Sequence, residues 1–557
     1  MSMTNITRRG ALRLATAGAS LATPALSSLW AWSTTAVAAS AAHEPLVDAD
    51  WLRRQRSDQV LLIDASPAPF VRRQRIEGAV HADLFSFGGR DVADDVWQQR
   101  LQRWGVDPSR TVVIYDQDGM MWATRLFFDL AYLGFPIERL RLLDGGLAAW
   151  RAAGGTVTAE APPAPAPGRF VVSGRREELH ARLPEMLQAS GEPARVTLVD
   201  ALEPSHYFGG ARFFDRAGHL PNARSWPRQE LFDATGRFKA RDELRRMATH
   251  LGLDPARPVY TYCGGGIAAT LPFFVLKFLL GYPDVRVHIG SLLEWQRDDR
   301  GLPMWTYARP LLMRDADWVQ GWGGALLRSV GMSQLSVVDL RPAADYAQGH
   351  LPYALHLPAE RFREHLRDPA ALAPALGAAG VDPQHEVVLV SGGGLTGDAA
   401  LAYAVLESLG QPRISILKES VDEWALRGHP LAKEPTVVGQ RRSPQDLVVP
   451  ERSYVARATP GALLRPATDG LYPRLSLAPG RQAPARRPQG AVVHLPYADL
   501  LEADGRPMAA HALWTRLDKA GLTRWAAVDC TADDPADAAA GAWLLRLMGL
   551  PDVRIAV

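Results

Sequence analysis

The chain has little of several things that would place it in a specialised class. It contains only 2 cysteines in 557 residues, which excludes a disulfide framework and a cysteine-rich zinc site. Its 62 Lys and Arg nearly balance its 60 Asp and Glu, so no basic excess points to nucleic acid as a partner. The 14 His are scattered without ligand-like spacing, so we expect no metal. After the first forty residues, no run is long and apolar enough to span a bilayer.

What is present fits a globular protein of several domains. Apolar residues make up 47% and charged residues 22%, close to the average for soluble proteins. At about 100–200 residues per domain, the length predicts three to five domains.

The first forty-one residues have the pattern of an export signal. The paired arginines Arg8 and Arg9 precede a stretch rich in Ala and Leu, and small residues over 36–41 suit a signal peptidase. We expect a twin-arginine signal peptide over residues 1–41, cleaved near Ala38 or Ala41. The twin-arginine export machinery would then deliver the protein to the periplasm. The alternative is a short amphipathic helix or a retained anchor.

Four segments of the chain share one layout, which is the signature of an internal repeat. Each begins with a short β-type run, found at 60–64, 196–200, 336–339 and, in degraded form, 474–478. A turn rich in Gly or Pro follows, and then a second β-type run that leads to one polar residue. These four polar residues are Asp116, Cys263, Ser391 and Cys530.

A tryptophan follows this polar residue in three of the four copies. Trp150, Trp295 and Trp424 come 34, 32 and 33 residues after Asp116, Cys263 and Ser391. A fourth tryptophan at this spacing would fall beyond Val557, so we expect the last unit to be the least regular.

In each unit, short buried strands alternate with stretches of helix length. This alternation predicts an α/β fold in which a small parallel sheet is covered by helices on both faces. The predicted domains cover residues 44–155, 169–305, 311–434 and 451–557. A Pro-rich linker at 159–168 separates the first two.

The loop after the second strand of the second unit suits a nucleophilic sulfur. The strand delivers Cys263 to the carboxyl end of the sheet, where ligands bind in open α/β folds. Three consecutive glycines then allow the backbone to curl around the sulfur without Cβ clashes. We expect the loop amides to point at the sulfur as in an anion nest, and the following helix to begin near Ala268 or Ala269. The loop residues are Gly264, Gly265, Gly266, Ile267, Ala268 and Ala269.

Both the loop amides and the helix start favour thiolate over thiol. The alternative is that Cys263 is a small buried apolar side chain. Three glycines at a strand-to-helix junction argue against that interpretation.

Together these motifs resemble the rhodanese superfamily of sulfurtransferases, over about residues 45–557. The resemblance rests on the Asp-ended first strand, the Gly-His-x-Pro-x-Ala turn at Gly218 and Gly349, the Cys263 loop and the recurring tryptophans. It implies four rhodanese-like domains arranged as two tandem pairs. In that family the first domain of a pair has often lost its Cys, commonly to Asp, whereas the second keeps it. Asp116 and Cys263 follow that arrangement.

By resemblance, the mechanism is a double displacement without a cofactor. The Cys263 thiolate takes a sulfane sulfur from a small anionic donor such as thiosulfate or 3-mercaptopyruvate. The resulting persulfide passes the sulfur to a thiol or to cyanide.

The sequence differs from the family at the positions that determine which sulfur donor is preferred. Thiosulfate-preferring members carry basic residues directly after the Cys, where Gly264 and Gly265 stand here. The mercaptopyruvate type usually has Ser in place of Gly265 and a His in place of Arg75, and the family tends to have an Arg where His206 stands. The donor therefore stays open, and the candidate contacts for its anion are His206, Arg212, Arg216 and Arg75.

The other three special residues are expected to do no chemistry. Acidic residues rather than glycines follow Cys530, and they would oppose a thiolate. Ser391 keeps a glycine-rich loop, which we expect to be structural or to hold a small anion. Asp116 is expected to brace the interface that faces Cys263. Since the two cysteines lie in different units, we expect them to remain unbridged.

Two other functions are consistent with parts of this pattern. One is a binding scaffold or sulfur carrier that receives sulfur from a partner in a slow single turnover. The other is a Cys phosphatase, but that chemistry needs an Arg to clamp phosphate where Ala268, Ala269 and Thr270 stand.

Overall fold

The structure is a computed structural model that describes residues 44–84, 92–162, 164–440, 443, 446–457, 459, 462–465, 474–485 and 491–556. The predicted signal peptide, residues 1–41, lies outside this part of the chain. The described residues belong to one compact unit, Glu44–Val557. Within them, no helix combines the length and the apolar character needed to cross a membrane.

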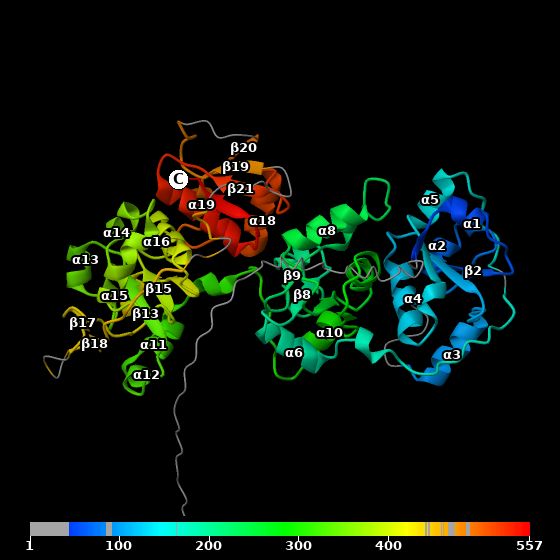
Figure 1. Ribbon diagram of the computed structural model, residues 1–557, viewed down its shortest axis with the longest axis horizontal. Helices are drawn as coiled ribbons and strands as arrows, with labels where there is room; N and C mark the ends of the chain where they lie inside the picture. The colour runs from blue at the N-terminus through cyan, green and yellow to red at the C-terminus, as the bar shows by residue number, and fades with distance from the viewer. Residues whose placement is uncertain are drawn as a thin grey trace, which may run out of the picture. The chain divides into compact units, whose positions relative to one another are not determined.

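Four parallel sheets repeat one strand order along the chain. Figure 1 labels strands of each, among them β2, β8, β15 and β21. The sheets run β6-β5-β2-β4, β11-β10-β8-β9, β16-β15-β13-β14 and β22-β21-β19-β20. In the first and third sheets, β1 and β12 add an edge strand beside β6 and β16. The expected α/β fold of repeated small parallel sheets is therefore confirmed.

The first two sheets are built from residues 46–297. The strands of the first are β1 (Leu46–Val47), β2 (Val60–Asp64), β4 (Val80–His81), β5 (Thr111–Tyr115) and β6 (Leu140–Leu143). Its helices are α1 (Ala49–Arg53), α2 (Ala68–Val71), α3 (Asp94–Arg103), α4 (Met121–Tyr132) and α5 (Gly146–Ala152). The strands of the second are β8 (Thr197–Asp200), β9 (Arg224–Ser225), β10 (Val259–Tyr262) and β11 (Val285–Val287). Its helices are α6 (Leu183–Gly191), α7 (Pro204–Tyr207), α8 (Arg241–His250), α9 (Thr270–Phe274) and α10 (Ser291–Arg297), and α9 continues into a π-helical turn, η4 (Val275–Leu279).

The third and fourth sheets follow the same plan. The strands of the third are β12 (Met313–Arg314), β13 (Leu335–Asp339), β14 (Leu355–His356), β15 (Glu386–Val390) and β16 (Arg413–Leu417). Its helices are α11 (Ala316–Gly323), α12 (Ala325–Ser329), α13 (Ala343–Gln348), α14 (Ala359–Glu364), α15 (Ala373–Ala378), α16 (Gly397–Ser408) and α17 (Val421–Leu426). The fourth has β19 (Arg474–Ala478), β20 (Ala491–His494), β21 (Ala527–Cys530) and β22 (Val553–Ile555), with α18 (Ala510–Lys519) and α19 (Pro535–Leu547).

Two small two-stranded sheets complete the described strands. An antiparallel one pairs β3 (Arg75–Ile76) with β7 (Val157–Thr158). A parallel one pairs β17 (Val437–Val438) with β18 (Val448–Val449).

Helices cover both faces of the sheets because neighbouring strand residues point to opposite sides. In β5, Val113 and Tyr115 join a core with α1 and α5, whereas Val112 and Ile114 join a core with α3 and α4. The second of these cores continues without a break into the second sheet.

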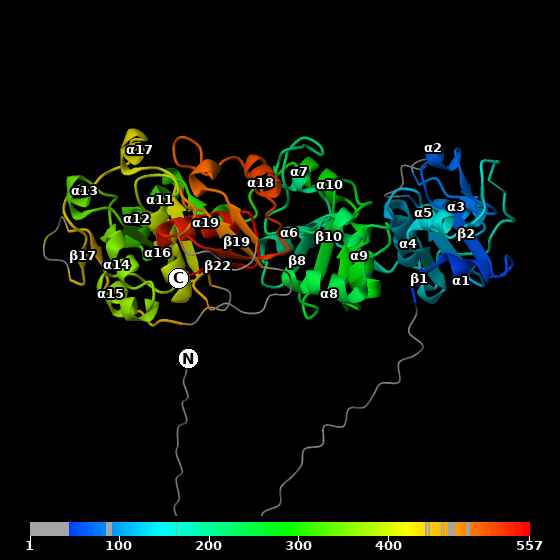
Figure 2. The ribbon, with the colours of Figure 1, turned by 90° about the horizontal axis from the view of Figure 1, so that it is seen from above.

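The first two domains meet through α4 and α9, which face each other (Figure 2). Phe127 of α4 meets Phe274 of α9 edge to face, with ring centroids 5.1 Å apart. The pair Phe128 and Phe273 repeats the contact at 5.3 Å. In the second half of the chain, α16 and α19 pack together in a shared core in the same way. This repetition supports the expected two tandem pairs.

The recurring tryptophans close their units. Each is buried and donates its indole N–H to a carbonyl oxygen six to eight residues further on: Trp150 to Thr156, Trp295 to Pro303 and Trp424 to Pro430. The fourth unit differs in another respect. Cys530 is the last residue of β21, whereas the sequence analysis placed it after the strand.

Candidate active site

Cys263 directly follows β10, a central strand of the second sheet. Strands β8 and β11 flank β10 on both sides, so the strand is held along its length. Cys263 itself is buried, with 3% of its surface exposed. The sulfur therefore lies at the carboxyl end of the sheet, as the sequence predicts.

Gly266 is in direct contact with the sulfur. Its N–H donates to Cys263 Sγ across 3.1 Å. Its φ of +81° favours glycine, and a Cβ atom here would stand 2.1 Å from the carbonyl oxygen of Ile289. Only glycine fits this position, so the sulfur contact requires Gly266. Ala269 caps the helix that follows, and α9 begins at Thr270.

Phe213 lies against the other side of the loop. A Cβ atom on Gly264 would fall 2.0 Å from the Phe213 ring, so the ring packs directly on this glycine. Phe213 is 40% exposed, and its ring centroid is 5.5 Å from that of His206. An aromatic side chain at the surface thus covers the loop that holds Cys263.

Ser291, which is not among the residues predicted from the sequence, provides a hydroxyl beside the sulfur. The N–H of Cys263 donates to Ser291 Oγ at 3.1 Å, and that oxygen lies 3.9 Å from Sγ. The hydroxyl also donates to the carbonyl oxygen of His288 at 2.8 Å, and the N–H of Leu292 donates to the carbonyl oxygen of Cys263 at 3.0 Å. The start of α10 is therefore fastened to the Cys263 loop. A sequence signal for this residue exists, because Ser291 lies four residues before the recurring Trp295.

The first domain also reaches this loop, through Arg125 of α4. Arg125 Nη1 donates to the carbonyl oxygen of Gly266 at 3.0 Å, while Nε donates to both oxygens of Asp129 at 2.9 and 3.0 Å. Both side chains of this ion pair are buried. Burial raises the pKa of Asp129, and the Arg125 cation opposes that shift. An Arg four residues before an Asp in an otherwise apolar helix was the sequence signal for this pair.

Asp116 occupies in the first domain the place that Cys263 has in the second. Its carboxylate accepts four backbone N–H groups at 2.8 to 2.9 Å, from Asp118, Met120, Trp122 and Ala123. Burial raises the pKa of Asp116 to about 6, and these hydrogen bonds oppose the shift. The repeated loop here carries its own anion, which fixes the start of α4 and so positions Arg125.

The four candidate donor contacts lie in different surroundings. His206 on α7 reaches the loop's edge through Phe213. Arg212 is exposed. Arg216 donates to the carbonyl oxygen of Leu302, and Arg75 is buried, donating to the carbonyl oxygens of Ile76 and Ala161. His206 thus contacts the ring that packs on Gly264, whereas Arg75 and Arg216 donate to backbone carbonyl oxygens.

The second cysteine, Cys530, lies in the core of the fourth domain. Cys530 is fully buried, and burial followed by the Asp529 charge raises the pKa of its thiol far above the ordinary value. Both cysteines are free thiols, as expected. Cys530 is therefore an uncharged side chain in the core of its domain.

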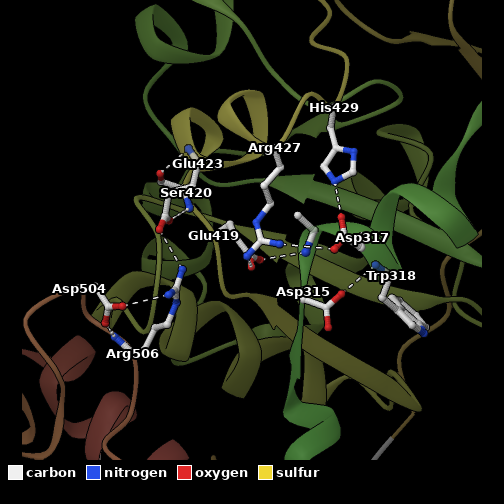
Figure 3. A network of polar contacts seen from close by, with 11 residues as sticks. Asp315, Asp317, Trp318, Glu419, Ser420, Glu423, Arg427, His429, Asp504 and Arg506 are labelled. Atoms are coloured by element: carbon white, nitrogen blue, oxygen red, sulfur yellow. Dashed lines mark hydrogen bonds and ion pairs between the residues drawn. The ribbon is translucent and has the colours of Figure 1, made fainter.

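The Ser391 loop is covered by a turn of the fourth unit. The N–H of Leu395 donates to the carbonyl oxygen of Gly505 at 2.8 Å. Next to it, Arg506 Nη2 donates to Glu423 at 2.9 Å within a polar network (Figure 3). Across the described ranges, no group of three or more His, Cys, Asp or Glu side chains is arranged to hold a metal.

Comparisons with known proteins show which family this chain matches. The model of the rhodanese-like domain matches residues 48–153, 182–298 and 325–427. The sulfur carrier protein TtuD of Thermus thermophilus is 30% identical over 273 residues, which cover 45% of this chain and 93% of that protein. A probable 3-mercaptopyruvate sulfurtransferase of Pseudomonas aeruginosa is 34% identical over 204 residues, 36% of this chain and 70% of that protein.

A solved structure shows a similar partial match. SseA from Escherichia coli, described as a 3-mercaptopyruvate sulfotransferase, is 24% identical and covers 44% of this chain and 98% of its own, with a TM-score of 0.41. The three family matches fall within the first three predicted domains, and the fourth has none. The chain's similarity to proteins named as thiosulfate and 3-mercaptopyruvate sulfurtransferases makes it a sulfurtransferase. Because the family matches cover more than half of its residues, the chain belongs to the rhodanese-like family.

Proposed function

We propose that the protein transfers a sulfane sulfur from a small anionic donor, through a persulfide on Cys263, to a thiol or to cyanide. The observation that carries this proposal is the 3.1 Å hydrogen bond from the Gly266 N–H to Cys263 Sγ. A hydrogen bond donated to sulfur stabilises negative charge that it carries during transfer.

The transfer consists of two displacement steps. The Cys263 thiolate attacks the outer sulfur of the donor, an S–S bond forms, and the donor's bond to that sulfur breaks. Its electron pair leaves with the donor, as sulfite from thiosulfate or as the enolate of pyruvate from 3-mercaptopyruvate. An acceptor thiolate or cyanide then attacks the outer sulfur of the persulfide and returns Cys263 as thiolate. The Gly266 N–H donates to the sulfur, and the Ser291 hydroxyl oxygen lies 3.9 Å from it.

The donor can be either thiosulfate or 3-mercaptopyruvate. Relatives carry both names: a thiosulfate sulfurtransferase of Corynebacterium glutamicum is 30% identical, and the Pseudomonas aeruginosa relative is named for 3-mercaptopyruvate. In this chain Gly264 and Gly265 leave the loop without a cation, which disfavours a dianionic donor.

A sulfur carrier is the second candidate function. Cys263 is buried beneath a loop that Phe213 covers, which would protect a persulfide from solvent thiols until a partner displaced the ring. The similarity to a protein named as a sulfur carrier is a further reason to test it.

Turnover separates the two functions. Wild type, Cys263→Ser and the matched control Cys530→Ser are assayed with each donor and with cyanide. We expect wild type and Cys530→Ser to turn over many times and Cys263→Ser not at all. Uptake of one sulfur per chain without further turnover would assign the carrier function instead.

We also propose that the protein acts in the periplasm after export by the twin-arginine route. The support is the Arg8-Arg9 pair followed by an apolar stretch. Lys substitution of both arginines should leave the protein in the cytoplasm in a cell fractionation assay, whereas periplasmic recovery of that variant would rule this route out.

A further inference from the structure

We propose that a cavity between the second and fourth domains binds a small organic anion that has an apolar portion. The cavity has a volume of about 690 Å³ and is lined by residues of both domains and by Arg309 of the segment that joins the second domain to the third. This volume is in the range of sites for small molecules, about 300–1,000 Å³. Cys263 is not part of the lining, so the proposal is independent of sulfur transfer.

Direct contacts join the two domains around this cavity. Arg524 Nη1 donates to the carbonyl oxygen of Ser225 at 2.6 Å, and the carbonyl oxygen of Arg524 lies 2.7 Å from His250 Nε2. The N–H of Arg309 donates to the carbonyl oxygen of Leu547 at 3.1 Å. The walls are therefore held in a fixed relation before any ligand binds, which lowers the entropic cost of binding.

The charge of the lining suits an anion. Three arginines, Arg224, Arg309 and Arg524, face two carboxylates, Glu230 and Asp518. Arg524 is paired with Glu230, and Asp518 is exposed. Over the residues that the structure describes, no carboxylate lies within 4.0 Å of the guanidinium nitrogens of Arg224 or Arg309.

Arg224 donates to the carbonyl oxygen of Leu251, and the cations of Arg257 and Arg309 repel its guanidinium group. Burial, followed by the cations of Arg257 and Arg309, lowers the pKa of Arg224. An anion between Arg224 and Arg309 would remove this repulsion, and planar guanidinium groups bind carboxylate, phosphate or sulfonate oxygens in pairs.

The remaining wall is apolar and aromatic. Phe208 of the second domain and Trp514 of the fourth are stacked with ring centroids 6.3 Å apart, and both line the cavity together with Leu522. An inorganic ion alone would leave this surface unused. The ligand class that matches both walls is an oxyanion attached to an aromatic or aliphatic body.

Two related probes test both halves of this proposal on the full chain. Anilinonaphthalene sulfonate has an aromatic body and an anion, whereas phenylnaphthylamine has a similar body without the charge. We expect Arg309→Gln to weaken binding of the sulfonate roughly tenfold, as loss of a charged hydrogen bond does, and to leave the neutral probe unaffected. Arg300→Gln, which removes an exposed arginine paired with Asp298, should change neither.

Trp514→Ala tests the location of the site and should weaken both probes. Unchanged sulfonate binding in Arg309→Gln, or an equal loss for both probes, would overturn the assignment of an anion site. Unchanged binding of both probes in Trp514→Ala would show that they bind elsewhere and would overturn it as well. Normal sulfur loading of Cys263 in each variant serves as the check that the chain is folded.

Discussion

Arg125 of the first domain donates a hydrogen bond to the carbonyl oxygen of Gly266, the residue whose own N–H donates to the sulfur of Cys263. The domain without a cysteine thus completes the loop of the domain that has one. This relationship gives a physical reason for the pairing, because Asp116 fixes the start of the helix that carries Arg125.

The double variant Arg125→Met, Asp129→Leu tests this role without leaving a buried charge unpaired. We expect iodoacetamide to alkylate Cys263 about tenfold more slowly, since a charged hydrogen bond that fixes the loop is lost. Cys530→Ser serves as the background, so that only one thiol reacts. Thr124→Val, which removes the 2.9 Å contact with Thr270 and the 3.2 Å hydrogen bond to the carbonyl oxygen of Met121, should have a small effect. An unchanged alkylation rate in the double variant would reduce Arg125 to a packing residue.

Phe213 should control access to the sulfur. Its ring covers Gly264, so Phe213→Ala opens the loop to large reagents. We expect a bulky maleimide to react with Cys263 at least several-fold faster, while a small alkylating reagent gains little. Phe214→Ala is the matched control, because Phe214 is similarly exposed and contacts Phe213 at 5.1 Å. Equal increases in the maleimide reaction rate in both variants would show that either substitution loosens this segment, and that the Phe213 ring does not specifically cover the sulfur.

Asp116→Asn should destabilise the first domain. The amide group would present N–H donors to backbone N–H donors, so about half of the four hydrogen bonds would be lost. A loss of about 1–3 kcal/mol in the free energy of unfolding is expected from urea titration. Asp118→Asn, a neighbouring substitution outside this set of acceptors, should cost much less, and equal costs would argue against the carboxylate's special role.

The buried carboxyl group of Asp200 should make the stability of the protein depend on pH. It ends β8 with no exposed surface, and burial raises the pKa of its carboxyl to about 7, against about 3.9 in an unfolded chain. The folded state therefore holds a proton that the unfolded state has lost. The stability from this group is fully present below about pH 4 and is lost as pH rises to about 7. Urea titrations from pH 5 to 8 should show wild type losing stability relative to Asp200→Asn up to about pH 7, and parallel curves would contradict the assignment.

The fold was largely predictable because the repeat shows itself in hydrophobic patterning. The first strands of units one and four, 60–64 and 474–478, coincide with β2 and β19. The strand before Cys263 was equally clear, since a buried parallel strand is a continuous apolar run. Cys530 was misplaced by one residue because a cysteine is as apolar as its neighbours and extends β21.

The site was predictable only for those of its residues that are adjacent in sequence. Cys263 and its glycines are adjacent in sequence, so their joint role could be read directly. Arg125 and Ser291 reach the loop from 141 and 28 residues away, through helix packing and a turn that a single sequence does not encode locally. For the same reason, the sequence could not tell that Arg75 and Arg216 bind backbone carbonyls.

The most direct test of the account is intact-protein mass spectrometry after exposure to thiosulfate or to 3-mercaptopyruvate. Wild type and Cys530→Ser should gain the mass of one sulfur with at least one of the donors, and a thiol or cyanide should remove it. Cys263→Ser should gain none. A gain that persists in Cys263→Ser, or no gain in wild type with either donor, would contradict sulfur transfer through Cys263.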